Sequence, residues 1–247
     1  KHRSFDRLFL SASKADEHIR IKPTTDTALA LGMLKVIVDE DLHDKEFLKT
    51  RSTAPCLVGA DGELALQDAN DPLSYLVLDT KTNELKRHDE EGIDPALSVA
   101  DTKFASDYTT VFDLTVAECQ KWTPEEVEKE TLVPADAVER IVREYAKADK
   151  SMIIDNMGGY MRIYNGTYSV ASHLNLCVFT GHVGAAGNGL CDAGGIGNIV
   201  KLDPMFDNPE VPADLPKIPR ANFAQHVMDD DPNPIDVFVS SRESVMT

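Results

Sequence analysis

The sequence predicts an α/β fold: a Rossmann-like three-layer domain with a mostly parallel sheet and a small β excursion around residues 55–85. Two observations lead to this prediction. Short apolar segments typical of strands alternate with amphipathic segments of helical period, and they follow the order strand, helix, β excursion, helix, strand, helix, glycine-rich loop, strand. Such alternation is typical of domains whose core strands run parallel. With 42% hydrophobic content the chain can bury one large core, and we expect residues 1–247 to form a single α/β domain of a larger chain.

The charge balance and the cysteines argue against several classes of function. Lys+Arg number 25 and Asp+Glu number 42, so the formal net charge is −17, which disfavours nucleic acid and anionic membranes as partners. No apolar run approaches the ~20 residues that cross a bilayer, so we expect no membrane span. The four cysteines contain no C-x-x-C pair, so the sequence indicates neither a zinc site nor an iron–sulfur cluster. Both a cytoplasmic location and export on a signal outside these residues stay open.

The first predicted helix follows a short predicted strand. Residues 19–21 alternate as in a strand, which ends at Pro23. Residues 27–39 then carry apolar side chains at i, i+3, i+4 and i+7, namely Ala30, Met33, Leu34 and Ile37. Further apolar positions widen this stripe, so we expect the helix to be buried on more than one side.

Thr24, Thr25 and Asp26 lie at the amino end of this helix, where unpaired backbone N–H groups and the positive end of the helix dipole gather. Thr25 or Asp26 is a suitable cap for the helix. The same helix end is equally suited to a phosphate, and the Asp26 carboxylate to the N–H groups of a purine-like ring. Spacing alone leaves both interpretations open.

The middle of the chain predicts a β-rich insertion and then a pair of helices. Turn residues punctuate the stretch from Pro55 to Leu85, and polar residues 87–107 extend it as a loop, so that residues 55–107 form the whole insertion. Thr123 is a suitable helix cap and is followed by proline at the first helical position. Pro134 opens the next helix, whose apolar face predicts packing on a sheet.

The stretch from Ser151 onward combines a strand, a turn and a helix. Residues 151–155 read as an apolar strand, Gly158 and Gly159 permit a tight turn, and a helix is expected from about Tyr164 to Thr180. His173 and His182 have no acidic or thiol partner at a ligand spacing, so we expect no metal there.

The glycine-rich loop from Gly181 to Gly197 follows a helix rather than a strand, so the usual dinucleotide fingerprint fails in this context. Proline-rich residues 203–234 are expected as an extended surface segment, and residues 235–239 as the last strand. Ligands in parallel sheets gather beyond the carboxyl ends of the strands, which places residues 157–164 and 23–26 at the candidate site.

Four motifs, in order along nearly the whole chain, resemble those of the dimethyl sulfoxide reductase family of molybdopterin oxidoreductases. They are the segment with IRIKPTTDTALALGML, the helix pair of KWTPEEVEKETLVPADAVERIVREYA, the stretch NMGGYMRIYNGTYSVASHLNLCVFTGHVGAAGNGL, and the closing IDVFVS. The resemblance implies that the chain is the central part of a large catalytic subunit that carries a bis(molybdopterin guanine dinucleotide) cofactor. It further implies that the molybdenum ligand, and any iron–sulfur cluster, lie upstream.

By this resemblance Asp26 would accept hydrogen bonds from the guanine, with Lys22, Thr24 and Thr25 beside the ribose and phosphates. The turn containing Gly158, Gly159, Tyr160 and Arg162 would approach the pterin or diphosphate of the cofactor. Arg162 would pair with phosphate, although it also suits an exposed position on the first turn of a helix. The glycine-rich loop would serve mainly in packing.

The chain departs from the family pattern at two places. Thr24 stands where the family motif PGTD has glycine, which puts the backbone contact to the nucleotide in question. Residues 240–244 replace the usual Gly-x-Asn-Pro turn, which weakens the transfer of a contact there.

The resulting functional expectation is a cofactor-binding domain of a molybdenum oxidoreductase that performs oxygen-atom transfer or a related two-electron reaction. No catalytic or metal-ligating residue is assigned within these residues, so the chain alone is expected to be inactive. The expected partners are the remaining domains of the same polypeptide and an electron-transfer subunit. The alternatives are a nicotinamide- or flavin-dinucleotide-binding domain and a non-enzymatic interaction module with an acidic surface.

Overall fold

The computed structural model describes residues 15–155, 163–192, 223–232 and 234, and the structural statements below refer to these residues. The chain divides into two compact units, Lys1–Gly195 and Ile196–Thr247, and each is described by itself.

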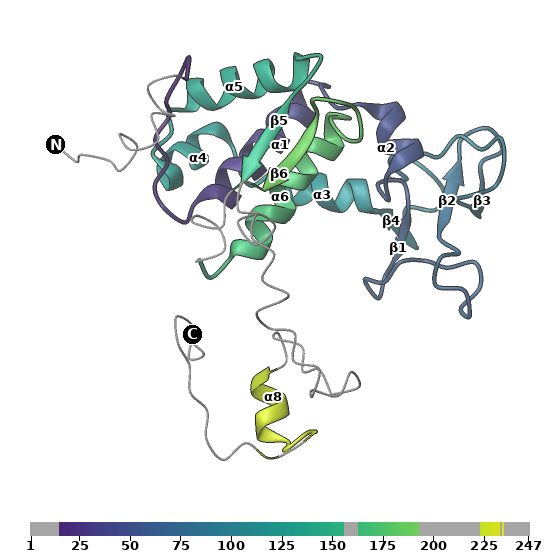
Figure 1. Cartoon of the computed structure of the whole chain (residues 1–247). Coiled ribbons are helices and arrows are strands. Elements are labelled where there is room, and N and C mark those ends of the chain that lie inside the picture. The colour runs from purple at the N-terminus through teal and green to yellow at the C-terminus, as the bar shows by residue number, and fades with distance from the viewer. Residues whose placement is uncertain (1–14, 156–162, 193–222, 233, 235–247) are drawn as a thin grey trace. The chain divides into compact units, whose positions relative to one another are not determined.

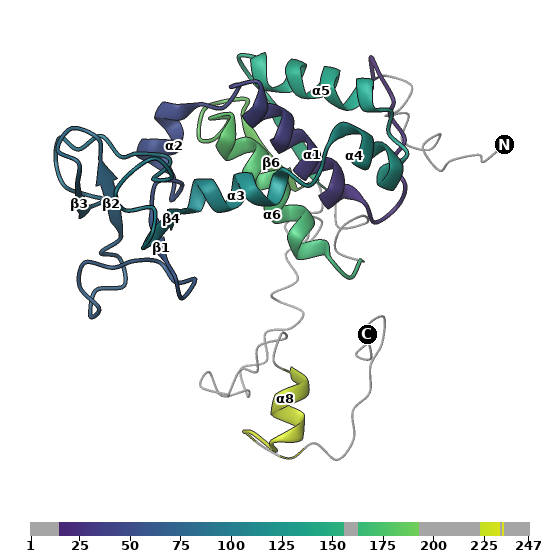
Figure 2. The same ribbon diagram turned by 180° about the vertical axis from the view of Figure 1, so that it is seen from behind.

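Helix α1 (Asp26–Asp39) is the centre of the first unit (Figure 1). It packs against α3 (Val111–Cys119), α4 (Pro124–Thr131), α5 (Ala135–Lys147) and α6 (Gly166–Phe179), which Figure 2 shows from the opposite side. Leu34 and Ile37 are fully buried, so the predicted apolar stripe forms the centre of the core. The predicted burial of this helix on more than one side is confirmed.

The predicted helix pair is also confirmed. The Thr123 hydroxyl accepts a hydrogen bond from the Glu126 N–H and so caps α4, with Pro124 at its first position. Helix α5 follows directly, and the Arg143 guanidinium holds Glu40, just beyond the end of α1, at 2.6 Å. This ion pair fixes the carboxyl end of α1 to α5.

The strands pair in three small sheets. Strand β5 (Met152–Asp155) pairs in parallel with β6 (Gly189–Asp192), whereas β1 (Leu57–Gly59) pairs antiparallel with β4 (Tyr108–Thr110), and β2 (Leu76–Asp79) antiparallel with β3 (Glu84–Arg87). The fold is therefore mixed α/β with two-stranded sheets, two of them antiparallel, rather than the predicted mostly parallel sheet as far as the described residues go.

The differences from the predicted strands have local causes. Between β2 and β3 the chain reverses within four residues and Asn83 takes a φ of 54°, so these strands must run antiparallel. Residues 19–21 form no strand, and just after them the Lys22 N–H donates to the carbonyl of Thr131, the last residue of α4, at 2.8 Å. The second parallel strand, β6, comes from the glycine-rich loop, and the predicted strand at residues 235–239 lies outside the described residues.

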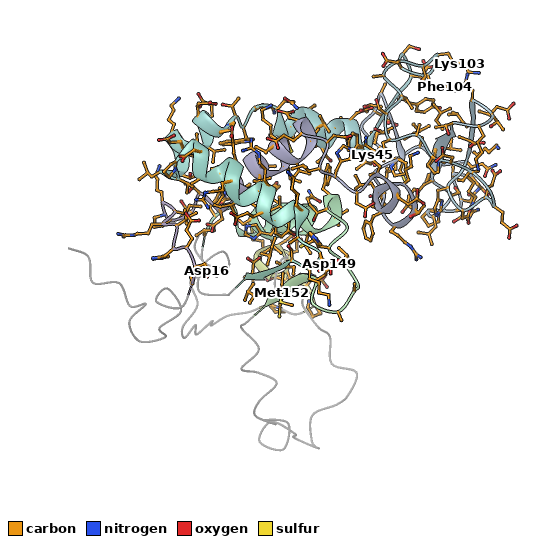
Figure 3. All side chains as sticks on the ribbon, turned by 90° about the horizontal axis from the view of Figure 1, so that it is seen from above. Asp16, Lys45, Lys103, Phe104, Asp149 and Met152 are labelled. Carbon is orange, nitrogen blue, oxygen red and sulfur yellow. The ribbon has the colours of Figure 1, made fainter. Side chains whose placement is uncertain are left out.

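The β excursion has a small core of its own, made of Leu57, Leu78, Ala96 and Val99. Part of the stretch 87–107, predicted as a polar loop, thus supplies core residues. Figure 3 draws the side chains of this region, where the Lys103 ammonium lies 4.9 Å from the centre of the Phe104 ring.

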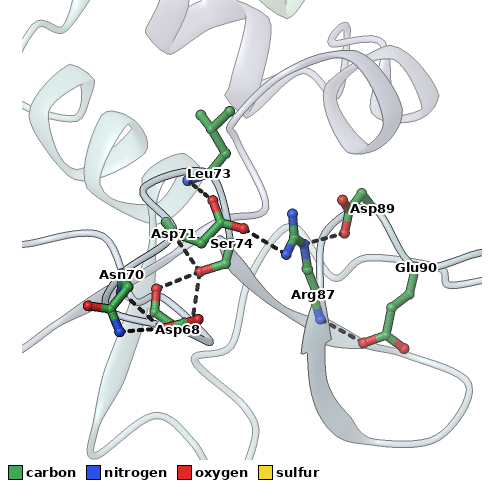
Figure 4. A network of polar contacts seen from close by, with 8 residues as sticks. All are labelled: Asp68, Asn70, Asp71, Leu73, Ser74, Arg87, Asp89 and Glu90. Atoms are coloured by element: carbon green, nitrogen blue, oxygen red, sulfur yellow. Dashed lines mark hydrogen bonds and ion pairs between the residues drawn. The ribbon is translucent and has the colours of Figure 1, made fainter.

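Polar contacts fix the turns around this small core. Arg87 bridges two turns, with Nη1 2.8 Å from Asp71 and Nε 2.7 Å from Asp89 (Figure 4). In the same figure the Ser74 hydroxyl donates to the carbonyls of Asp68 and Asp71.

Helix α2 (Lys45–Arg51) precedes the excursion, and Asp44 caps it by accepting the Phe47 N–H at 2.9 Å. In the second unit, residues 223–228 form helix α8 (Phe223–Met228), although this stretch was predicted to be extended. A helix is possible there because residues 223–228 contain no proline to interrupt it. Residues 203–222 lie outside the described part of the chain. None of the described helices is long and apolar enough to cross a membrane.

Gly32 offers a test of the packing between α1 and α4. A Cβ at this position would lie 2.3 Å from Cγ2 of the buried Val127. We expect Gly32→Ala to lower the free energy of unfolding by about 1–3 kcal/mol, because the clash exceeds the gain in helix propensity. Urea unfolding measures this change. In a double-mutant cycle with Val127→Ala, the double variant should lose less unfolding free energy than the sum of the losses of the two single variants. Additive losses would contradict the clash.

Asp79 should make the stability of the excursion pH-dependent. The side chain is 1% exposed and accepts hydrogen bonds from the Asp94 N–H at 3.0 Å and the Lys86 ammonium at 2.7 Å. These two donors, the backbone N–H foremost, hold the pKa of Asp79 far below its usual range. The ionised Asp79 carboxylate therefore stabilises the folded chain at pH values above the unfolded-state aspartate pKa of about 4. This stabilisation is lost progressively as the pH falls below that pKa.

We expect Asp79→Asn to lower the thermal unfolding midpoint at pH 7, with a difference from wild type that shrinks as the pH falls below about 4. The exposed Asp101 provides the control, because Asp101→Asn should change stability by less than about 0.5 kcal/mol. A pH-independent difference for Asp79→Asn would contradict the assignment.

Candidate functional site

The turn that leads into α1 is held in an unusual conformation. Thr24 has a φ of 75°, in the left-handed region that β-branched residues rarely adopt. The turn is fixed on one side by the hydrogen bond from the Lys22 N–H to the Thr131 carbonyl, at 2.8 Å. On the other side the Thr25 hydroxyl donates to the Lys22 carbonyl at 2.7 Å. The surrounding contacts therefore impose the strained backbone at Thr24.

The amino end of α1 has no side-chain cap. Thr25 occupies the cap position, but its hydroxyl is used by the Lys22 carbonyl rather than by a helix N–H. Asp26 is the first helical residue and half-buried, and its carboxylate makes no hydrogen bond or ion pair with another described residue. The interpretation of these side chains as a plain helix cap is therefore wrong. A free carboxylate and free backbone N–H groups share this helix end.

The Lys22 ammonium lies 3.4 Å from Glu130, and both side chains are about half exposed. An exposed pair of this kind stabilises the protein by less than about 1 kcal/mol. The ammonium is therefore easily redirected toward an anionic ligand.

The amino end of α6 lies beside the amino end of α1. The Thr27 hydroxyl, in the first turn of α1, is 2.8 Å from the Ser169 hydroxyl and 3.4 Å from the Asn165 amide nitrogen of α6. Asn165 occupies the cap position of α6 without capping it through its side chain. Two positive helix ends without side-chain caps therefore lie side by side, an arrangement that attracts anions such as phosphate.

The sequence did not reveal this pairing of helix ends. Asn165 and Ser169 are separated from Thr27 by about half of the chain, and each alone is an ordinary residue for the start of a helix. The only available signal was the polar residue at the start of each predicted helix.

Strand β5 ends in a buried contact between a carboxylate and an imidazole. Asp155 is 8% exposed, and both of its carboxylate oxygens lie 3.0 Å from Nδ1 of His173 on α6. No acidic residue lies at a metal-ligand spacing from His173 in the sequence, and the partner that the structure supplies comes from a strand eighteen positions earlier.

The remaining predicted residues divide into two groups. Thr24, Thr25 and Asp26 lie together as predicted. Gly158, Gly159, Tyr160 and Arg162 lie outside the described residues, between the end of β5 and residue 163.

His182 serves the structure. Its Nδ1 lies 2.8 Å from the Thr180 hydroxyl and its Nε2 3.0 Å from the Ala148 carbonyl, which ties the end of α6 to the end of α5. The part of the chain that the structure describes contains no group of three or more His, Cys, Asp or Glu side chains arranged to hold a metal. Burial raises the pKa of the Cys56 and Cys119 thiols to about 11, so both stay protonated.

The donor set at the paired helix ends fits a nucleotide. An unpartnered carboxylate suits the N–H groups of a purine, and backbone N–H groups at helix ends suit phosphate oxygens. A molybdopterin guanine dinucleotide contains both a purine and phosphates.

Comparison with known proteins identifies relatives of this chain. Residues 4–225 match the family of molybdopterin oxidoreductases. The chain is 32% identical to the respiratory nitrate reductase subunit alpha of Haloferax mediterranei, over 73% of its own length and 21% of that protein. It is 30% identical to the perchlorate reductase subunit alpha of Dechloromonas aromatica, over 73% of its length and 24% of that protein.

The dimethylsulfide dehydrogenase subunit alpha of Rhodovulum sulfidophilum is 28% identical, over 72% of this chain and 21% of that protein. The chain thus spans less than a quarter of the length of these three relatives. The family match covers most of the chain and confirms the resemblance that the four sequence motifs indicated. The chain belongs to the molybdopterin oxidoreductase family.

Proposed function

We propose that this chain is the molybdopterin guanine dinucleotide-binding domain of a molybdenum-dependent oxidoreductase. The observation that carries the proposal is the corner at the amino end of α1, where the Asp26 carboxylate and the helix N–H groups lack side-chain partners among the described residues. Membership of the molybdopterin oxidoreductase family supports a cofactor of this class.

Within the corner, Asp26 accepts hydrogen bonds from the guanine, since an ionised carboxylate only accepts. Thr24 and Thr25 contribute mainly through the backbone at the start of α1, because the Thr25 hydroxyl is used by the Lys22 carbonyl. The Lys22 ammonium lies beside the phosphates and exchanges its contact with Glu130 for them.

The second part of the proposed site follows β5. Parallel strands β5 and β6 end together, at Asp155 and Asp192, and ligands of α/β sheets gather beyond such ends. We assign the next residues, Gly158, Gly159, Tyr160 and Arg162, to the pterin or diphosphate of the cofactor.

The outer face of β5 supports a larger sheet in the complete enzyme. Met152 and Ile154 are 49% and 65% exposed, although apolar side chains on a parallel sheet are normally covered by helices on both faces. We infer that β5 and β6 belong to a Rossmann-like three-layer sheet, whose second covering layer lies among residues other than those described.

When bound, the cofactor supplies molybdenum for oxygen-atom transfer or a related two-electron reaction. The chain's own residues hold and orient the cofactor, and the metal ligand comes from the rest of the polypeptide, as does any iron–sulfur cluster. The three relatives described above are each named as a subunit, which supports an electron-transfer subunit as a further partner.

The proposal predicts that Asp26→Ala weakens cofactor loading of the enzyme that contains this chain. Loss of hydrogen bonds to a charged group costs about 1.5–3 kcal/mol, so binding should weaken roughly tenfold or more. Molybdenum analysis and detection of guanine after acid hydrolysis measure the loading.

The control for Asp26→Ala is Asp136→Ala, which removes the exposed first-turn carboxylate of α5 and should leave loading unchanged. Equal loading in both variants would remove Asp26 from the site. A wild-type enzyme without molybdenum or guanine would overturn the proposed function.

The strained turn predicts a second, separable effect. Thr24→Gly should raise the free energy of unfolding by about 1 kcal/mol, because glycine adopts a φ of 75° without the steric cost that a Cβ carries. Thr24→Ala keeps the Cβ and should show no such gain. Chemical denaturation compares the three proteins, and equal stabilisation by both substitutions would contradict the strain.

A further inference from the structure

The contact of Asp155 with His173 lies at the sheet edge to which the proposed function assigns the cofactor. Asp155 is the last residue of β5, and His173 lies on α6 directly beside it. About seven residues of α6, roughly 10 Å of helix, precede His173 and lead to the helix end beside Thr27. The imidazole thus contacts the last residue of β5, and the helix that carries it leads to the paired helix ends.

The carboxylate determines which nitrogen of His173 carries hydrogen. An ionised Asp155 only accepts hydrogen bonds, so Nδ1, at 3.0 Å from both oxygens, carries the hydrogen in the neutral ring. Nε2 then carries a lone pair and acts as an acceptor. The side chain is 17% exposed, and Nε2 makes no hydrogen bond with the described residues.

Two titratable groups near this contact, Cys177 and Tyr145, have raised pKa values and stay protonated at neutral pH. Cys177 lies one helical turn beyond His173 along α6. Burial is the main reason why the pKa of its thiol is raised, and the Asp155 charge contributes. The Tyr145 hydroxyl of α5 lies 3.5 Å from that sulfur, and burial raises the pKa of Tyr145 as well. Neither group competes with His173 for the carboxylate.

We propose that Nε2 of His173 accepts a hydrogen bond from a ring N–H or amino group of the heterocyclic ligand at this edge, and that Asp155 is its positioning residue. The inference rests on the proposed function, in which that ligand is a pterin or guanine ring system. A purely structural ion pair would need the contact between Asp155 and His173 but not a particular state of Nε2, which separates the two roles by experiment.

The first test is the hydrogen state of the ring. In the 247-residue chain at pH 8, nitrogen chemical shifts of labelled histidine should show Nδ1 with hydrogen and Nε2 without it. In Asp155→Asn the amide can donate to Nδ1, so the two nitrogens should exchange roles, as occurs when the aspartate of a catalytic triad is changed to asparagine. Hydrogen on Nε2 in the wild-type chain would overturn the proposal.

The second test is retention of the cofactor by the enzyme that contains this chain, followed as pterin released during dialysis. His173→Phe removes the acceptor and Asp155→Asn turns it into a donor, so both variants should release pterin at least about fivefold faster than wild type. His173→Gln restores an acceptor oxygen and should recover part of the retention.

His88→Phe is the matched control, because His88 is an exposed histidine in the β excursion, and it should release pterin at the wild-type rate. Unchanged release by Asp155→Asn in a loaded enzyme would overturn the role of His173 alone. A wild-type enzyme without pterin would instead overturn the proposed function and, with it, the ligand assigned to His173.

Discussion

The burial of α1 is the constraint on which the rest of the first unit depends. Four helices pack against α1, and Leu34 and Ile37 near its middle are fully buried. Its carboxyl end is closed by polar contacts: Lys35 joins Asp39 at 2.6 Å and Gln120 at 2.7 Å, and Arg143 holds Glu40. At its amino end the Asp26 carboxylate and the first helix N–H groups make no such side-chain contacts with the described residues. The asymmetry between the two ends of one buried helix places the candidate site.

A net charge of −17 is at first sight a poor setting for a ligand that carries phosphates. Most acidic side chains have little effect on such a ligand if they lie far from it, because exposed charges are largely screened beyond about 8 Å at physiological ionic strength. The helix ends act within their first turn, and here two of them adjoin through Thr27, Asn165 and Ser169. The local field at the corner is therefore set by these N–H groups, by the Asp26 carboxylate and by the pair of Lys22 and Glu130, while the acidic surface governs solubility and disfavours nucleic acid.

The sequence predicts the parts of this fold that depend on local chemistry. The periodic helices α1, α5 and α6, the start of α4 and the apolar strand β5 all follow from spacing, capping and turn residues. Contacts between distant segments were not predictable from one sequence. The contact of Asp155 with His173 joins a strand to a helix, and the hydrogen bond between Thr27 and Ser169 spans 142 positions. Strand β6 was missed because it begins with Gly189 inside a glycine-rich stretch that reads as a loop; in the structure Gly189 pairs with Met152 of β5 and has a φ of 118°, a value that favours glycine.

Three features of the corner at the amino end of α1 cost stability. Thr24 adopts a strained φ, Asp26 is half-buried without a partner among the described residues, and the Thr25 hydroxyl does not cap the helix. Each feature alone is tolerable, but a chain selected only for stability would place glycine at Thr24 and a true cap before α1. Natural proteins break such local rules mainly where function requires it. A ligand that satisfies the carboxylate and the helix N–H groups binds only the folded state, so it stabilises the fold by mass action. The groups that cost stability at this corner are therefore the ones through which the proposed nucleotide gains its affinity.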